Sequence, residues 1–217
     1  MKKQQVIEKI KQEKIVVIVR GVSEDKLLGL CQALYDGGVR LIEITFDAKG
    51  IVTDEQTAAR IALLCREFDG KICIGAGTVM NVKQAKLAAK AGAKYLISPN
   101  FNRSVIKFAN KNGIVSMPGA MTPTEIVDAY DAGADFVKVF PADSLGLGYL
   151  KAVKAPLSHI PIIAVGGVNE NNIADFIEAG LDGVGIGSNI VKKSMIEQGD
   201  LEGITTLAKT YTSAINK

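Results

Sequence analysis

The sequence predicts an α/β protein, a single (β/α)8 TIM barrel with an N-terminal helix. Short apolar runs rich in β-branched residues alternate with amphipathic helical stretches along the whole chain. Eight such units, each of about 20–25 residues, match the compact end of the size range for this barrel. Glycines also stand near the ends of the helical stretches, where helices commonly stop. We therefore expect one barrel domain over residues 1–217.

The expected strands are the eight apolar runs. In chain order they cover residues 15–20, 39–46, 71–76, 93–99, 113–118, 134–140, 160–165 and 181–187. The stretches between them, such as EDKLLGLCQALYDG and NVKQAKLAAKAG, place apolar residues at helical spacing and are the expected helices. A further helix is expected before the first strand, over roughly residues 2–13. A doubly wound open sheet is the competing architecture, but it seldom needs eight such even repeats.

A local repeat places two ionisable side chains in the predicted barrel interior. The segments GGVRLIEI, AGAKYLIS, AGADFVKV and AGLDGVGI each run from a helix-ending glycine into an apolar strand. Aligned on their second glycines, which are Gly38, Gly92, Gly133 and Gly180, they hold Glu43, Ile97, Lys138 and Gly185 at one common position. One layer of a barrel interior comes from alternate strands. Glu43 and Lys138 are therefore expected in one layer, on the second and sixth strands.

Composition excludes several classes of protein. Hydrophobic residues make up 47% of the chain, which is enough for a large core and excludes disorder. The net charge is only +3 and no basic block is present, so nucleic acid is not an expected partner. No apolar run approaches the roughly 20 residues that span a bilayer, and no membrane partner is expected. The N-terminus lacks the apolar stretch of a signal peptide, so we expect a cytoplasmic protein.

Cysteine and histidine usage argues against a metal centre. Cys31, Cys65 and Cys73 are odd in number and lack CxxC spacing, so we interpret them as buried reduced thiols. His159 is the single histidine and has no partner pattern for zinc. We expect no metal and no cofactor.

Lys138 and Glu43 are the candidate catalytic pair. Each interrupts an apolar strand, FVKVF or LIEIT, where burying a charge is costly. Desolvation lowers a lysine pKa, and the neutral amine is the nucleophile that forms a Schiff base with a ketone. A partly desolvated carboxylate such as Glu43 can then act as general base and acid. A buried ion pair without chemistry is the alternative interpretation.

The loops after the seventh and eighth predicted strands are the candidate phosphate site. Gly166, Gly167, Gly187 and Ser188 supply backbone N–H groups where helices begin. In β/α barrels these two loops form the recurrent phosphate site. After the third strand, GAGT lacks the third glycine of a dinucleotide fingerprint, and Thr78 more plausibly faces a ligand. Arg20 ends the first strand and can bind a carboxylate, although a plain surface arginine is nearly as good an interpretation.

Seven stretches together resemble the 2-keto-3-deoxy-6-phosphogluconate (KDPG) and 4-hydroxy-2-oxoglutarate (KHG) aldolase family. In chain order they are GGVRLIEITF, IGAGTVMN, LISPN, MPGAMTPTE, VKVFPA, AVGGVN and GIGS, and they span nearly the whole sequence. The resemblance implies a metal-independent lyase with Lys138 as the Schiff-base lysine and Glu43 as the proton shuttle. It also implies Arg20, Thr78 and Pro99 around pyruvate, the four glycine and serine positions around phosphate, and a homotrimer in carbohydrate metabolism of the Entner–Doudoroff kind.

Two departures from the family pattern bear on specificity. Many gluconate-type relatives have Arg where this chain has Asp47, so carboxylate binding is expected to depend more on Arg20. Those relatives also have Pro-Thr before the paired glycines, where this chain has Ala164 and Val165. With Asn after Pro99, Val165 resembles the branch that acts on the galactonate epimer (KDPGal). The sequence therefore leaves the choice of epimer open.

Two other functions remain alternatives. A phosphosugar isomerase or epimerase would use Glu43 as the base and Lys138 only for its charge. A non-catalytic phosphosugar-binding barrel would keep the buried pair for structure alone. The isomerase would form no reducible adduct, and the binding barrel would bind its ligand without turnover.

Overall fold

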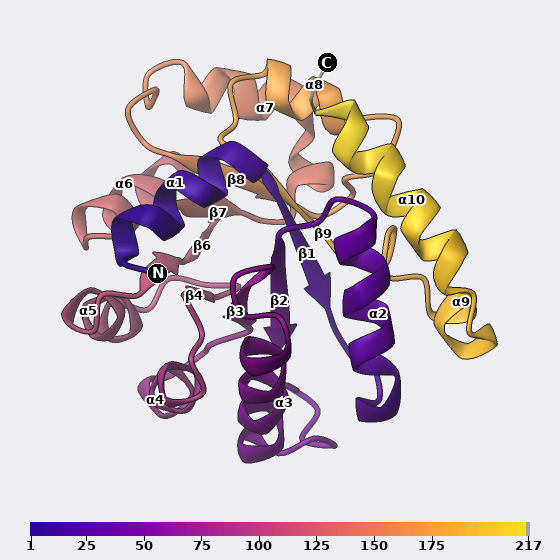
Figure 1. Ribbon diagram of the computed structural model, residues 1–217. Coiled ribbons are helices and arrows are strands. Elements are labelled where there is room, and N and C mark those ends of the chain that lie inside the picture. The colour runs from indigo at the N-terminus through magenta and orange to yellow at the C-terminus, as the bar shows by residue number, and fades with distance from the viewer. Residues whose placement is uncertain (216–217) are drawn as a thin grey trace.

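The computed structural model describes residues 1–215. Nine strands and ten helices make up this part of the chain, and they alternate except where β6 follows β5 and α10 follows α9 (Figure 1). The strands are β1 (Ile15–Val19), β2 (Leu41–Thr45), β3 (Cys73–Gly77), β4 (Tyr95–Ile97), β5 (Val115–Met117), β6 (Gly119–Ala120), β7 (Val137–Val139), β8 (Ile162–Val165) and β9 (Gly183–Ile186).

The helices precede, separate and follow the strands. They are α1 (Lys3–Glu13), α2 (Glu24–Asp36), α3 (Asp54–Glu67), α4 (Val82–Lys90), α5 (Arg103–Lys111), α6 (Pro123–Asp131), α7 (Ala142–Lys154), α8 (Ile173–Glu178), α9 (Lys193–Gln198) and α10 (Leu201–Ala214). None of these helices, within residues 1–215, has the length and apolar character needed to cross a bilayer.

The strands form one parallel sheet that curls into a barrel. Their order is β5-β4-β3-β2-β1-β9-β8-β7-β6, and all eight strand pairs are parallel. The two outermost strands of this order, β5 and β6, are consecutive in the chain and separated only by Pro118. They are one barrel strand divided at a proline, which has no N–H for the ladder. The predicted (β/α)8 barrel is confirmed, and this division explains the ninth strand.

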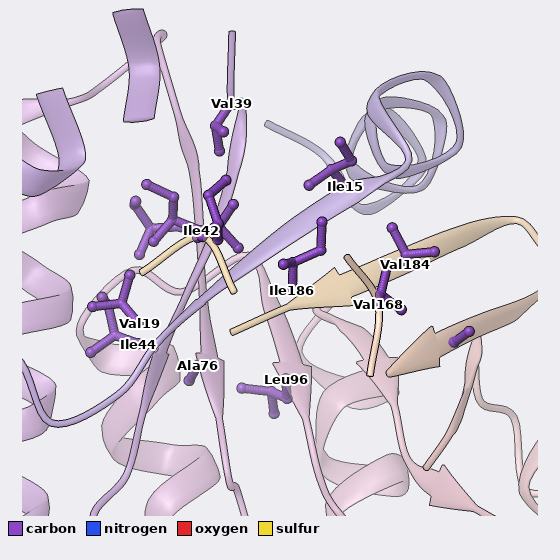
Figure 2. Close-up of a cluster of buried hydrophobic side chains, with 14 of the residues drawn as sticks. Ile15, Val19, Val39, Ile42, Ile44, Ala76, Leu96, Val168, Val184 and Ile186 are labelled. Carbon is purple, nitrogen blue, oxygen red and sulfur yellow. The ribbon is translucent and has the colours of Figure 1, made fainter. Parts of the chain in front are cut away.

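Alternation along each strand sorts the side chains into two layers. Figure 2 shows Ile42 and Ile44 of β2 in the hydrophobic cluster that also contains apolar residues of the helices. Val137 and Val139 of β7 belong to the same cluster. Because side chains alternate between the two faces of a strand, Glu43 and Lys138 must face the barrel interior. The common interior layer predicted from the repeat is thus consistent with the fold.

The interior is a separate apolar cluster that α1 closes. Val6 and Ile10 of α1 pack with residues from six strands, including Val16 and Tyr95, and with Phe136 just before β7. Helix α1 was expected over roughly residues 2–13 and is observed over Lys3–Glu13. Lys3 attaches its N-terminal end to the barrel through a 2.9 Å ion pair with Asp135.

The four glycines of the sequence repeat have a conformational role. Each connects a helix to the next strand with a positive φ, at 93° for Gly38, 96° for Gly92, 94° for Gly133 and 83° for Gly180. Residues with a Cβ are strained in this region, so glycine is the residue that permits the turn.

Candidate active site

Lys138 and Glu43 occupy the interior of the barrel. Lys138 lies on β7 and is 8% exposed, while Glu43 lies on β2 and is 1% exposed. Burial lowers the pKa of Lys138, and the Arg20 charge lowers it further, whereas Glu43 raises it. Burial raises the pKa of Glu43, against the opposing effect of Lys138 and Arg20. Both groups therefore shift toward their neutral forms.

The two side chains influence each other electrostatically without a direct ion pair. Among the ion pairs of residues 1–215, none joins Lys138 to Glu43. The Oε2 atom of Glu43 is buried and has no hydrogen-bond partner in this part of the chain. The Lys138 Nζ atom lies 5.0 Å from the centre of the Phe140 ring. An unpaired buried carboxyl oxygen is costly, so a water molecule or a ligand that donates to it is favoured.

Strand β3 makes room for Glu43 through glycines at alternate positions. A Cβ on Gly77 would overlap the Glu43 carboxyl group, and one on Gly75 would overlap the ring of Tyr95. Tyr95 is fully buried and donates a 3.4 Å hydrogen bond to the carbonyl oxygen of Cys73. Our sequence analysis missed Tyr95 and the spacing role of Gly75 and Gly77. The period-two glycines of CIGAG were the available signal, since alternate strand residues face the same side.

Arg20 and Thr78 are linked at the carboxyl ends of β1 and β3. The Arg20 Nη2 atom donates a 3.0 Å hydrogen bond to the Thr78 hydroxyl. Thr78 has a φ of 56°, which is unusual for a β-branched residue. Such a conformation costs about 1–3 kcal/mol and is concentrated at functional sites. Arg20 is an exposed side chain at this strand end, in contact with Thr78.

The two glycine loops are fixed by asparagine amides. The Gly167 carbonyl oxygen accepts hydrogen bonds from the side chains of Asn169 at 3.2 Å and Asn172 at 3.0 Å. Asn189, from the loop after β9, donates a 2.7 Å hydrogen bond to the Val168 carbonyl oxygen. The N–H groups of Gly166 and Gly167 donate to no other residue within 1–215. Positive φ values of 105° and 71° explain why these two positions are glycines.

One cavity of about 460 Å3 brings nearly all of the candidate residues together. Its lining includes Arg20, Thr78, Pro99, Lys138, Val165, Gly166, Gly167, Gly187 and Ser188. Glu43 lies outside the lining and is buried next to it, as its electrostatic coupling to Lys138 and Arg20 indicates. Val165 lies beside Gly185: a Cβ on Gly185 would lie 2.8 Å from the Cγ2 atom of Val165.

Asp47 has a structural role that the sequence did not indicate. Its carboxylate accepts hydrogen bonds from the backbone N–H groups of Lys49 at 2.9 Å, Ile51 at 2.8 Å and Val52 at 3.0 Å. These bonds lower the pKa of the Asp47 carboxyl group. The residue therefore shapes the loop between β2 and α3.

A family model described as KDPG and KHG aldolase matches residues 6–207. The chain belongs to this family. A 2-dehydro-3-deoxy-6-phosphogalactonate aldolase of Escherichia coli strain K12 is 33% identical to this aldolase over 202 residues, covering 93% of the chain and 96% of the relative. A 2-dehydro-3-deoxy-phosphogluconate aldolase of Treponema pallidum is 31% identical, covering 94% of each.

A solved structure connects this fold to covalent chemistry on pyruvate. The KDPG aldolase of Legionella pneumophila, with pyruvate captured as a covalent carbinolamine intermediate, aligns with a TM-score of 0.83 at 25% identity. The alignment covers 97% of this aldolase and 98% of that chain. Family membership makes this protein a lyase of the aldolase class.

The three cysteines are free thiols in the structure. Cys31 and Cys73 are buried and Cys65 is half-buried, all as free thiols. Burial raises the pKa of Cys31 to about 12 and that of Cys73 to about 11, so neither is a reactive thiolate. Within residues 1–215, no group of three or more His, Cys, Asp or Glu residues is arranged to hold a metal ion.

Proposed function

We propose that this chain is a Schiff-base aldolase that reversibly cleaves KDPG, or its galactonate epimer, to pyruvate and glyceraldehyde 3-phosphate. We also propose cleavage of 4-hydroxy-2-oxoglutarate to pyruvate and glyoxylate. The observation that carries the proposal is a buried lysine, coupled to a buried carboxyl group, in a cavity between a cationic end and a glycine-rich end. The relatives named above act on phosphorylated sugar acids of this kind.

In the proposed reaction, the neutral Lys138 amine adds to the C2 ketone and gives a carbinolamine. Loss of water forms an iminium, which accepts the electron pair of the C3–C4 bond as that bond breaks. Glu43 removes the C4 hydroxyl proton, directly or through a water molecule. Glyceraldehyde 3-phosphate leaves, and the enamine is protonated and hydrolysed to pyruvate and free Lys138.

The remaining residues are proposed to hold the two ends of the substrate. Arg20 and Thr78 bind the carboxylate, with Pro99 beside them, and a planar guanidinium suits that group. Gly166, Gly167, Gly187 and Ser188 bind the phosphate through backbone N–H groups and the Ser188 side chain. Binding both ends positions the C3–C4 bond over Lys138 and Glu43.

Reduction with borohydride in the presence of pyruvate, followed by peptide mass mapping, tests this function. We expect a pyruvate-derived adduct on Lys138 and none on the Lys138→Met variant. An unmodified Lys138 under conditions where pyruvate binds would favour the isomerase alternative. We propose that no metal takes part, so activity should persist in excess EDTA.

Epimer choice is proposed to depend on Val165, which lines the cavity beside the glycine loop. We propose a preference for the galactonate epimer. Val165→Thr adds one hydroxyl group, and a hydrogen bond of about 1 kcal/mol would change the ratio of kcat/KM for the two epimers by roughly fivefold to tenfold. An unchanged ratio would mean that the preference is set elsewhere.

The assembly and location are also proposals. We propose a homotrimer, to be checked by sedimentation velocity, with residues 1–217 acting as one aldolase domain. The three free thiols support a cytoplasmic location, because thiols stay reduced in that compartment.

A further inference from the structure

A second cavity, of about 660 Å3, lies beside the active-site cavity. It is located between the carboxyl ends of β1 and β2 and the helices α2 and α3, which are neighbours in Figure 1. Among residues 1–215, Arg20 alone lines both cavities. No step of the proposed aldol reaction uses the second cavity. Its volume falls within the range of small-molecule sites.

The charges around the second cavity favour an anion. Arg20, Lys49, Arg60 and Lys193 line it, against the single carboxylate of Asp47 among the described lining residues. That carboxylate is already occupied by the three backbone N–H groups of its own loop. Asp47 keeps its negative charge, and Glu24 and Glu197 form ion pairs with Arg60 at 3.6 Å and with Lys193 at 3.5 Å. Four cations against three carboxylates leave one positive charge in excess for an entering anion.

Arg60 supplies an unused donor inside this cavity. Its side chain is 19% exposed, and its Nε atom is buried without a hydrogen-bond partner in residues 1–215. Nε forms an ion pair with the Glu24 Oε2 atom at 3.6 Å, which is too long for a hydrogen bond, and Nη1 donates a 3.4 Å hydrogen bond to the Val22 carbonyl oxygen. A buried guanidinium N–H without a hydrogen-bond partner is costly, so a ligand that accepts from it is favoured.

The remaining walls are apolar. Ile51, which is 80% exposed, and the half-buried Val22 and Val52 contribute apolar surface to the lining, next to the buried core residues Leu27, Ile44 and Phe46. A small inorganic anion would leave Ile51, Val22 and Val52 in contact with water. An organic anion with an apolar body would instead bury them and gain from the hydrophobic effect. Guanidinium groups bind carboxylates with two parallel hydrogen bonds.

We propose that this second cavity binds a small organic carboxylate with an apolar body, held by Arg60 and Arg20. A guanidinium has five N–H donors, and Thr78 accepts from only one nitrogen of Arg20. A ligand that draws Arg20 toward the second cavity weakens its contact with a keto acid in the first. The two ligands therefore oppose each other, and by linkage each lowers the affinity of the other. This site goes beyond the proposed aldolase activity and makes it subject to inhibition.

Benzoate is a suitable probe, measured by calorimetric titration and as an inhibitor of turnover. We expect saturable binding and a rise in the KM of the keto acid with little change in kcat. Arg60→Met should weaken benzoate binding by about tenfold or more, since it removes a charge-assisted partner. Turnover without benzoate should be unchanged. Arg66→Met, on the same helix and 71% exposed, is the matched control and should bind benzoate normally.

Two further results decide the proposal. Lys49→Met, at an exposed lining position, should also weaken benzoate binding, which keeps the test valid if Arg60→Met fails to fold. No saturable binding, or equal affinity in Arg60→Met, Lys49→Met and the unmodified protein, would overturn the second site. The titration needs no turnover, so a failed aldolase assignment would be recognised separately by the missing Lys138 adduct.

Discussion

At the scale of single residues, the chemistry depends on how one apolar interior treats an amine and a carboxyl group. Lys138 and Glu43 are both pushed toward neutrality by burial, and each resists the shift of the other. The charge of Arg20 lowers the pKa of both groups. It therefore favours the neutral form of Lys138 and the ionised form of Glu43. The reactive fraction of Lys138 amine at neutral pH is thus set by three side chains.

The pH dependence of adduct formation should depend on the charges of Lys138, Glu43 and Arg20. The neutral amine is lost as the pH falls through the pKa of Lys138, which lies below its ordinary value of 10.5. Glu43→Gln removes a group that raises this pKa, so the half-maximal pH should move down. Arg20→Gln removes a group that lowers it, so the half-maximal pH should move up.

These shifts can be measured by cyanoborohydride trapping at saturating pyruvate over a pH series. Arg103→Gln, at an exposed arginine on α5, is the control and should leave the profile unchanged. Shifts of the same sign in Glu43→Gln and Arg20→Gln would contradict the electrostatic account.

The space around Glu43 gives a second prediction at this scale. Gly77→Ala would place a Cβ where the Glu43 carboxyl group lies. We expect kcat to fall by tenfold or more, and stability to fall by about 1–3 kcal/mol through overpacking. Gly148→Ala is the control, because Gly148 has a helical position with open space around its Cβ. Denaturant titration and steady-state kinetics on both variants check the prediction, and an active Gly77→Ala would exclude a fixed position for Glu43.

At the scale of elements, strands determine which way side chains face and loops provide the donors. The glycine-aligned repeat placed Glu43 and Lys138 at one common position of the predicted barrel interior, and the alternation of side chains along β2 and β7 is consistent with it. The same reasoning missed Tyr95, because its location depends on a glycine of the neighbouring strand. The positive φ of Thr78 was equally beyond prediction, since its sequence neighbours require no such turn. Asp47 accepts hydrogen bonds from backbone N–H groups of its own loop. The direction of those N–H groups depends on the loop conformation, which no sequence pattern specifies.

The loop after β8 carries the prediction at this scale. Asn172 donates to the Gly167 carbonyl oxygen and accepts from the Asn169 N–H at 2.8 Å. Losing both bonds in Asn172→Ala should free the loop and raise the KM of phosphorylated substrates about thirtyfold, at about 1 kcal/mol for each bond. The unphosphorylated 4-hydroxy-2-oxoglutarate should be affected much less. Asn171→Ala, at an exposed neighbour, is the control. Equal losses on both substrates would count against a phosphate role for this loop.

At the scale of the whole molecule, the barrel has an open catalytic end and a closed opposite end. The eightfold alternation predicted the barrel correctly, because eight similar units leave few other ways to pair the strands. The division of the fifth strand at Pro118 was not anticipated, although a proline at the end of an apolar run is a known interruption of pairing. Lys138 lies beside this division on the neighbouring strand, because its N–H donates a 2.9 Å hydrogen bond to the Pro118 carbonyl oxygen.

The closed end should govern stability without governing chemistry. Ile10 of α1 is 1% exposed and packs in the interior cluster, which contains no candidate residue except Val165. Ile10→Ala leaves a cavity and should cost about 2–5 kcal/mol, or roughly 5–15 °C in Tm for a chain of this size. Ile7→Ala, at a half-buried position on the same helix, should cost less. Thermal unfolding and kinetics at 25 °C separate the two effects: we expect kcat and KM to stay within about twofold of the unmodified aldolase. A large loss of kcat in the folded variant would mean that α1 positions Glu43 or Lys138 through the interior layer.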